Sequence, residues 1–239
     1  GRVGERPGVL TRHSGSGVYV GVAVAVLALW GVVNAGRRKN GPFTPEERRW
    51  IWFWAGSACV SLGLAWGKYA PFYQIVYGLP YFSTIRNPIK FIHPFSLSVV
   101  ILSGYGFEAL ARLYLARAAA VASRPASSLK AWWAQAVPFE RKWWFGSALA
   151  MGAGLLGWLL YAASRQDLVN HLRTAVSPQL APAIAGFSLT EMGWFVLFLG
   201  LTLLLLLLVG SGILGGTRAR WGVAALGLVL VGDLIRANA

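Results

Sequence analysis

The sequence is poor in charged residues, and acidic residues are the scarcest. Only 13% of its 239 residues are Asp, Glu, Lys or Arg, whereas a water-soluble domain carries about 25%. Eight acidic residues stand against 22 Lys and Arg residues, so the formal net charge is +14. Hydrophobic residues make up 56% of the chain, and its mean hydropathy is +0.55. This composition argues against a water-soluble globular domain and predicts an integral membrane protein.

Cysteine and the motifs of soluble enzymes are also missing. Cys59 is the single cysteine, so no internal disulfide can form. The sequence has no phosphate-binding loop, no paired cysteines, no His-Glu-x-x-His and no Gly-x-Ser-x-Gly. We therefore assign no metal site and no catalytic residue. The cations are scattered over the ends of hydrophobic segments, where they match anionic headgroups. We expect membrane lipids, and not nucleic acid, as partners.

Six hydrophobic segments predict transmembrane helices. Residues 17–35 and 193–214 carry no charge at all, and each reaches the roughly 20 residues that cross a bilayer core about 30 Å thick. The other four predicted spans are 45–66, 92–115, 143–163 and 221–237. The predicted fold is an all-α polytopic transmembrane helix bundle with a re-entrant or interfacial loop, forming one domain over residues 1–239. We interpret the chain as an internal fragment that lacks both ends of a longer protein.

Local patterns mark two helix starts and one ion pair. Thr44, Pro45 and Glu47 form a capping-box pattern that opens the second span. The segment from Ser188 to Glu191 repeats that pattern before the fifth span. Glu108 and Arg112 lie four residues apart, the spacing at which helical side chains pair.

The distribution of Lys and Arg orients the bundle. Thirteen of the 22 basic residues fall in the connections 36–49, 111–142 and 215–220, which six spans place on one side. The side richer in Lys and Arg faces the cytoplasm. The 67–91 loop is therefore predicted to face the outside of the membrane.

That loop, GKYAPFYQIVYGLPYFSTIRNPIKF, contains three prolines and cannot form one straight helix. We expect a short interfacial helix over residues 71–77, then an extended piece that enters the next span. Arg86 and Lys90 flank Pro88 near the start of that span, where free N–H groups and two cations suit a phosphate. The alternative is an interfacial loop whose aromatic and basic residues anchor to lipid headgroups.

Three segments resemble the YfhO-type family of bacterial polytopic membrane proteins, which is similar to GT-C class glycosyltransferases. These segments are GVYVG at 17–21, LPYFSTIRNPIKF at 79–91 and DLIRAN at 233–238. The resemblance implies transfer of a sugar from a polyprenyl-phosphate carrier at the extracytoplasmic face of the bacterial cytoplasmic (inner) membrane. It also implies a catalytic Asp or Glu, often with a divalent cation, in an early extracytoplasmic loop outside this chain.

The same resemblance assigns donor-phosphate binding to Arg86 and Lys90, with Lys68 and His93 as neighbouring candidates. A transporter or flippase of lipid-linked glycans is one alternative function, and a non-catalytic assembly subunit is another.

Three further ionisable residues are candidates with ordinary structural alternatives. Asp233 lies three residues before Arg236, so it is either a partner in a helix-end ion pair or a functional intramembrane carboxylate. Asp167 and His171 lie one turn apart on an amphipathic stretch. They form either an acid–base pair or weak cation site, or part of a solvated interfacial helix. Residues 177–187 are expected to form a lid or re-entrant piece.

Overall fold

The computed structural model describes residues 19–39, 41–70, 75–76, 78–80, 88–115, 129–214 and 218–238, and all regular structure within them is helical. The predicted all-α class is therefore confirmed for these residues. The main elements are α1 (Val22–Ala35), α2 (Pro45–Ala65), η1 (Gly67–Tyr69), η3 (Pro88–Phe91), α4 (Ile92–Leu110), η4 (Ala111–Leu115), α6 (Leu129–Gln135), α7 (Pro138–Ala163), α8 (Arg165–Ala175), α9 (Ala181–Gly210) and α10 (Ala219–Asn238).

Among the residues that the structure describes, three helical segments are long and apolar enough to cross a membrane. They are Pro88–Tyr114, Pro138–Ala163 and Ala181–Gly210, and α1 is a shorter apolar helix. The chain is therefore a membrane protein. The six predicted spans correspond to α1, α2, α4, α7, α9 and α10, but the length and polarity of the helices single out only three of them.

Several predicted boundaries shift. Helix α1 begins at Val22, later than the predicted start at residue 17, and α7 begins at Pro138, earlier than the predicted 143. Helix α9 begins at Ala181, so the helix start predicted at Ser188 is wrong and most of the expected lid at 177–187 is ordinary helix. The extra turns form because Ala181 and Ala185 pack against Val169 of α8.

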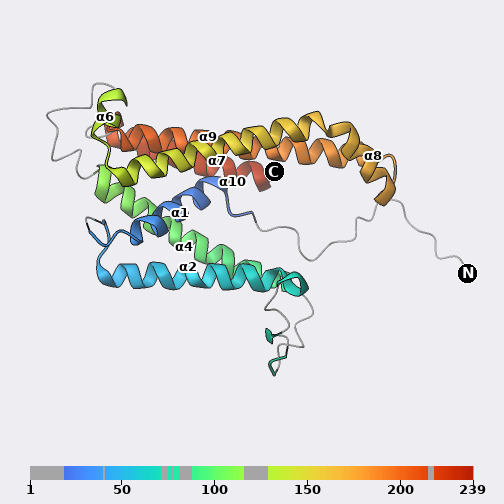
Figure 1. Ribbon diagram of the computed structural model, residues 1–239, viewed down its shortest axis with the longest axis horizontal. Coiled ribbons are helices and arrows are strands. Elements are labelled where there is room, and N and C mark those ends of the chain that lie inside the picture. The colour runs from blue at the N-terminus through green and yellow to red at the C-terminus, as the bar shows by residue number, and fades with distance from the viewer. Residues whose placement is uncertain are drawn as a thin grey trace, which may run out of the picture.

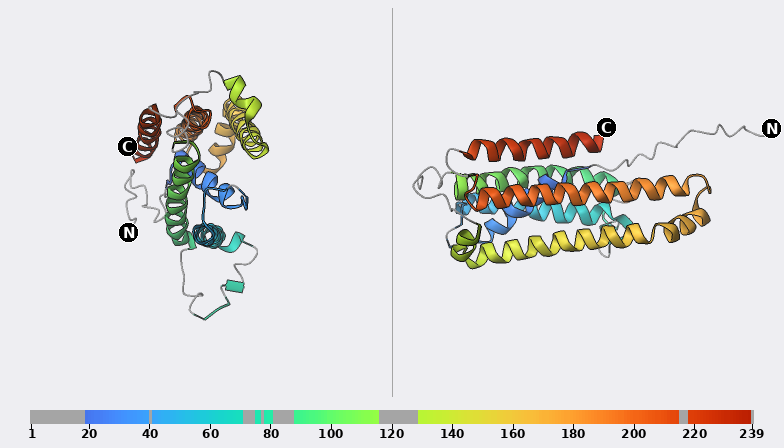
Figure 2. Two further views of the ribbon diagram at one scale, coloured as in Figure 1. Left: turned by 90° about the vertical axis from the view of Figure 1, so that its left-hand side faces the viewer. Right: turned by 90° about the horizontal axis from the view of Figure 1, so that it is seen from above.

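Helices α2, α7, α9 and α10 run along roughly one common direction, whereas α1 and α4 are inclined to them and cross each other (Figures 1 and 2). Helices α7 and α9 lie side by side on one side of the molecule, α2 lies on the other, and α1 and α4 lie between them. Helix α1 ends, α2 begins, α4 ends and α7 begins at the same end of the bundle, where α6 also lies (Figure 1). We call this the α6 end, and the opposite end the α8 end.

The central contact joins the backbones of α1 and α4. A Cβ on Gly106 would lie 1.9 Å from the carbonyl oxygen of Leu27, and a Cβ on Gly31 would lie 2.9 Å from the backbone nitrogen of Gly106. Neither position can hold a larger residue without separating the two helices. Leu27, Leu102 and neighbouring apolar side chains complete this core.

Charged and polar side chains satisfy the C-terminal end of α1. The Nε of Arg48 donates to the carbonyl oxygen of Ala35 at 2.8 Å. The buried Asn34 donates to the carbonyl of Trp30 at 2.9 Å and accepts from Arg37 at 3.1 Å. The first turn of α2 therefore holds the last turn of α1, where backbone carbonyls lack helical partners.

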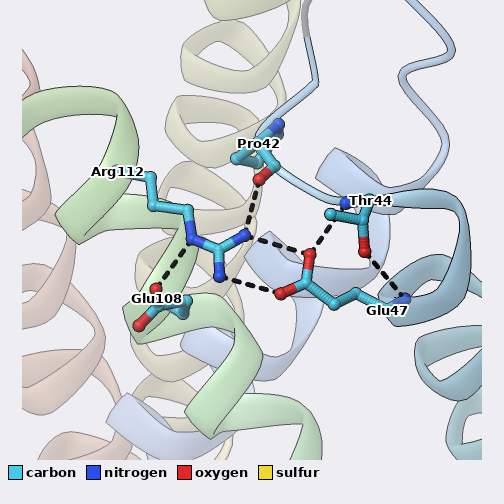
Figure 3. A network of polar contacts seen from close by, with 5 residues as sticks. All are labelled: Pro42, Thr44, Glu47, Glu108 and Arg112. Atoms are coloured by element: carbon cyan, nitrogen blue, oxygen red, sulfur yellow. Dashed lines mark hydrogen bonds and ion pairs between the residues drawn. The ribbon is translucent and has the colours of Figure 1, made fainter.

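A network around Arg112 ties α4 to the start of α2 (Figure 3). The predicted pair is confirmed, because Arg112 Nε donates to Glu108 at 2.7 Å. The two terminal nitrogens of Arg112 also donate to the two carboxylate oxygens of Glu47, at 2.8 and 3.0 Å, and one of them donates to the carbonyl of Pro42 at 2.9 Å. Glu47 still completes the predicted capping box with Thr44.

We predict that Glu47→Gln lowers the free energy of unfolding by about 1 kcal/mol at pH 6, since the amide keeps the capping geometry but loses the charge. Denaturant titration of the detergent-solubilised protein at pH 6 measures the loss. Glu46→Gln is the matched control, because Glu46 is an exposed residue of the same helical turn. An equal loss in the two variants would contradict the assigned role of the network.

Candidate functional site

Two places hold most of the residues that the sequence singled out, and the first is the corner where α2 ends and α4 begins, away from the α6 end (Figure 1). Gly67 has a φ of 55°, and a Cβ there would lie 3.0 Å from Cγ of Pro88. Glycine is therefore needed both for the backbone conformation and for the close approach. This contact brings η1, which contains Lys68, next to η3, which contains Lys90.

The side chains at this corner are open to their surroundings. Lys90 and His93 are both exposed, one turn apart at the start of the helix. The structure describes the backbone of Lys68 but not its side chain, and Arg86 lies outside the described residues, as does most of the predicted 71–77 helix. Two of the four predicted phosphate-binding residues are thus placed with their side chains, and both are accessible to a ligand.

Large apolar side chains are exposed beside these cations. Trp66 is 61% exposed and Tyr69 is 81% exposed at the end of α2 and in η1, and Ile89 is exposed between Pro88 and Lys90. The corner therefore combines positive charge with an apolar surface. This combination suits a ligand that has an anionic head and a hydrocarbon chain.

The second place is a buried carboxylate where α10 meets the start of α1. Asp233 is 2% exposed. One of its oxygens accepts the hydroxyl hydrogen of Tyr19 at 2.5 Å, and the other accepts the backbone N–H of Val22 at 2.6 Å. Asp233 therefore caps the N-terminus of α1 from another helix, where the free N–H groups favour a negative charge.

Glycine permits this close approach. Gly21 has a φ of 94°, and a Cβ there would lie 3.3 Å from Oδ2 of Asp233 and 3.2 Å from Cδ2 of Leu234. Tyr19 and Gly21 belong to the GVYVG segment, and Asp233 opens the DLIRAN segment. Two segments that are more than 200 residues apart in the chain therefore meet at one carboxylate.

The helix-end ion pair between Asp233 and Arg236, one of the two interpretations of Asp233, is not formed. The guanidinium of Arg236 pairs instead with both carboxylate oxygens of Glu191 on α9, with one contact at 3.1 Å. It also lies 5.2 Å from the centre of the Trp194 ring. Arg236 therefore joins α10 to α9, while Asp233 joins α10 to α1.

Asp167 and His171 lie on α8, and both side chains are exposed. Among the residues that the structure describes, no group of three or more His, Cys, Asp or Glu side chains is placed to hold a metal ion. These two residues fit the solvated face of an amphipathic helix, whose apolar face packs against α9.

Sequence reasoning missed the partners of the singled-out residues. Tyr19, the partner of Asp233, lies in an apolar segment and was not singled out. Glu191, the partner of Arg236, was interpreted as part of a helix start. A polar residue in an otherwise apolar segment was the available signal for both.

The comparisons with known proteins identify no relative: no family model matches the chain, and neither a curated protein nor a solved structure matches it.

We predict that Asp233→Asn lowers the free energy of unfolding by about 2 kcal/mol. The amide nitrogen cannot accept a hydrogen bond, so either the Tyr19 hydroxyl or the Val22 N–H would face another donor. Unfolding in mild detergent measures the loss. The control Asp167→Asn, at an exposed position, should change stability by less than about 0.5 kcal/mol. If the two variants behave alike, the capping role of Asp233 is refuted.

Proposed function

We propose that this chain is the membrane part of a glycosyltransferase-like protein that uses a polyprenyl-phosphate-linked sugar donor. The observation that carries the proposal is the corner at the start of α4, where the contact of Gly67 with Pro88 brings the predicted basic segments together beside exposed apolar side chains. The resemblance of the three sequence segments supplies the reaction class, namely sugar transfer.

The chemistry of the corner fits the carrier lipid. A phosphate needs cations and N–H donors, which Lys90, Arg86 and the start of a helix supply. A polyprenyl chain needs an apolar surface that continues into the membrane, and Trp66 and Ile89 begin such a surface next to Lys90. The resemblance implies a catalytic acidic residue, often with a divalent cation, in an extracytoplasmic loop, and it assigns that role to no residue of this chain.

We further propose that the six predicted spans, α1, α2, α4, α7, α9 and α10, form the membrane bundle in the bacterial cytoplasmic membrane, with the short α1 enclosed by longer helices. Helices α2 and α10, with 21 and 20 residues, are each about 30 Å long, which equals the bilayer core. Both run roughly along the direction of α7 and α9, two of the three longer apolar segments (Figures 1 and 2). The described parts of the connections rich in Lys and Arg lie at the α6 end, namely residues 36–39, 41–49, 111–115, 129–142 and 218–220. This arrangement supports a cytoplasmic α6 end and an extracytoplasmic α8 end.

A transporter or flippase of lipid-linked glycans is the second candidate, and the buried Asp233 favours it. Ionisable residues inside membrane helices commonly mark ion or substrate pathways. If this candidate is correct, Asp233→Asn should abolish ion-driven transport in proteoliposomes without preventing carrier binding. If the chain is a glycosyltransferase, the wild-type protein should show no ion-driven transport in proteoliposomes, and Asp233→Asn should act through the stability of the fold alone.

We predict that Arg86→Ala and Lys90→Ala, made separately in the full-length protein, each weaken binding of polyprenyl phosphate by about tenfold and abolish sugar transfer. Titration of the carrier into protein in lipid nanodiscs measures affinity, and a radiolabelled sugar measures transfer. Lys142→Ala is the control, since Lys142 is exposed near the start of α7, at the α6 end. Wild-type affinity and transfer in both variants would exclude the phosphate role.

We predict that position 90 is reached from outside the cell. In a Cys59→Ser background, which removes the exposed native thiol, Lys90→Cys should react with an impermeant maleimide in intact cells. Lys142→Cys should react only after the membrane is permeabilised. The reverse pattern would overturn both the orientation and the proposed site of carrier binding.

A further inference from the structure

Helix α6 runs across the axis of α7 at the α6 end (Figure 1). Val137, between the two helices, has an extended backbone, so the chain turns there. Arg141 on α7 then holds the end of α6, because one of its terminal nitrogens donates to the carbonyl oxygens of Trp133 at 3.3 Å and Ala134 at 3.0 Å. Since α7 is long and apolar enough to cross a membrane, a helix that runs across α7 lies along the membrane surface.

Aromatic contacts set the depth of α6. The ring of Trp132 lies 6.2 Å from the ring of Trp144, which belongs to the second turn of α7. Helix α6 therefore lies beside the first turns of α7 and does not extend away from the bundle. Tryptophan side chains are enriched at the level of the lipid headgroups. Phe145 and Leu149, the next large apolar residues of α7, are strongly exposed, as expected where the hydrocarbon layer begins.

One face of α6 is apolar and exposed. Leu129 and Trp133 lie four residues apart and therefore share a face of the helix, and their exposed fractions are 43% and 44%. Gln135 is exposed on the opposite face. A helix that carries Trp and Leu on one face and polar residues on the other is suited to lie in the interface of a bilayer.

Three exposed cations accompany this face, namely Lys130, Arg141 and Lys142. Glu140 is the only acidic residue in α6 and the first two turns of α7. Its carboxylate is already engaged, because one oxygen accepts the hydroxyl of Tyr114 and the other caps the start of α7. Among the residues that the structure describes, no ion pair involves the three cations. Their charges therefore complement an anionic surface outside the protein.

Helix α7 needs an anchor of this kind, because the rest of the protein covers it poorly. None of its 26 residues is buried. Lipid tails can cover its apolar sides, but they do not fix its depth in the bilayer. A helix that lies in the interface and is hydrogen-bonded to the first turns of α7 does fix that depth.

We propose that α6 and the first turns of α7 form an interfacial anchor for anionic phospholipids. Leu129 and Trp133 enter the boundary between headgroups and acyl chains. Lys130, Arg141 and Lys142 meet the phosphates of the surrounding lipids. The anchor is separate from the carrier-binding corner and does not depend on the glycosyltransferase proposal.

The depth of α6 tests the proposal first. In a Cys59→Ser background, nitroxide labels are placed at Leu129→Cys and at Gln135→Cys in separate proteins, in nanodiscs of phosphatidylglycerol and phosphatidylcholine. Oxygen should relax the label at position 129, and a water-soluble nickel chelate should relax the label at 135. Equal access of the chelate to both labels would overturn the proposal, because α6 would then lie in water. A label at 129 that neither reagent reaches would also overturn it, since a second copy of the chain would then cover this face.

Lipid preference tests the cations. A fluorophore at Leu129→Cys is quenched in bilayers of equal parts phosphatidylglycerol and phosphatidylcholine, with one of the two lipids brominated at a time. Brominated phosphatidylglycerol should quench about fivefold more, which is roughly the effect of one basic residue near an anionic surface. Lys130→Gln combined with Lys142→Gln should largely remove this preference.

The matched control combines Arg165→Gln with Arg173→Gln, at two exposed positions of α8, and should keep the preference for phosphatidylglycerol. Equal quenching by the two lipids in the labelled parent protein would refute the role of the cations. A preference that survives unchanged in the double lysine variant would refute it as well.

Discussion

Helix α1 has 14 residues, so it is about 21 Å long and shorter than a bilayer core of about 30 Å. Inside a membrane its free backbone groups must find partners within the protein, because lipid tails offer none. Asp233 of α10 accepts an N–H at the start of α1, and Arg48 of α2 donates to a carbonyl at its end. The positions of α2 and α10 therefore follow from the need to cap one short central helix.

Close packing against α4, and not polar contacts, holds the middle of α1. Gly106 and Gly31 let the backbones of α1 and α4 touch, and such close approach increases dispersion contacts in a place where lipid competes for apolar surfaces. The start of α2 then fastens both helices at one end. Arg48 binds α1, while the preceding Glu47 binds Arg112 at the end of α4. Polar contacts thus fix the two ends of the core, and glycine packing fixes its centre.

The contacts that the sequence predicted correctly join residues that lie close together in the chain. The capping box of Thr44 and Glu47 and the pair of Glu108 with Arg112 are set by spacings of three and four residues, and both are present. The contacts of Asp233 with Tyr19 and of Glu47 with Arg112 join distant segments, and a single sequence carries no signal for such pairs. The predicted span 17–35 was too long for the same reason. Hydropathy cannot show that a distant carboxylate caps the helix at its first residue, Val22. The corner was predictable as a basic, proline-containing loop, but the packing of Gly67 on Pro88 was not.

The geometry of Asp233 also weighs the two proposed functions against each other. A carboxylate that carries ions or protons through a membrane must exchange its partners during each cycle. Both oxygens of Asp233 are already occupied, one by a hydroxyl and the other by a backbone N–H at the positive end of α1. Releasing the second would leave Val22 with an unpaired N–H in an apolar setting, at a cost comparable to a lost hydrogen bond. Repeated release would therefore require α1 to move as a unit, yet its contact with α4 leaves no space even for a Cβ at Gly106. Asp233 is thus better suited to hold α1 in place than to carry a charge, and this weighs against the second of the two proposed functions.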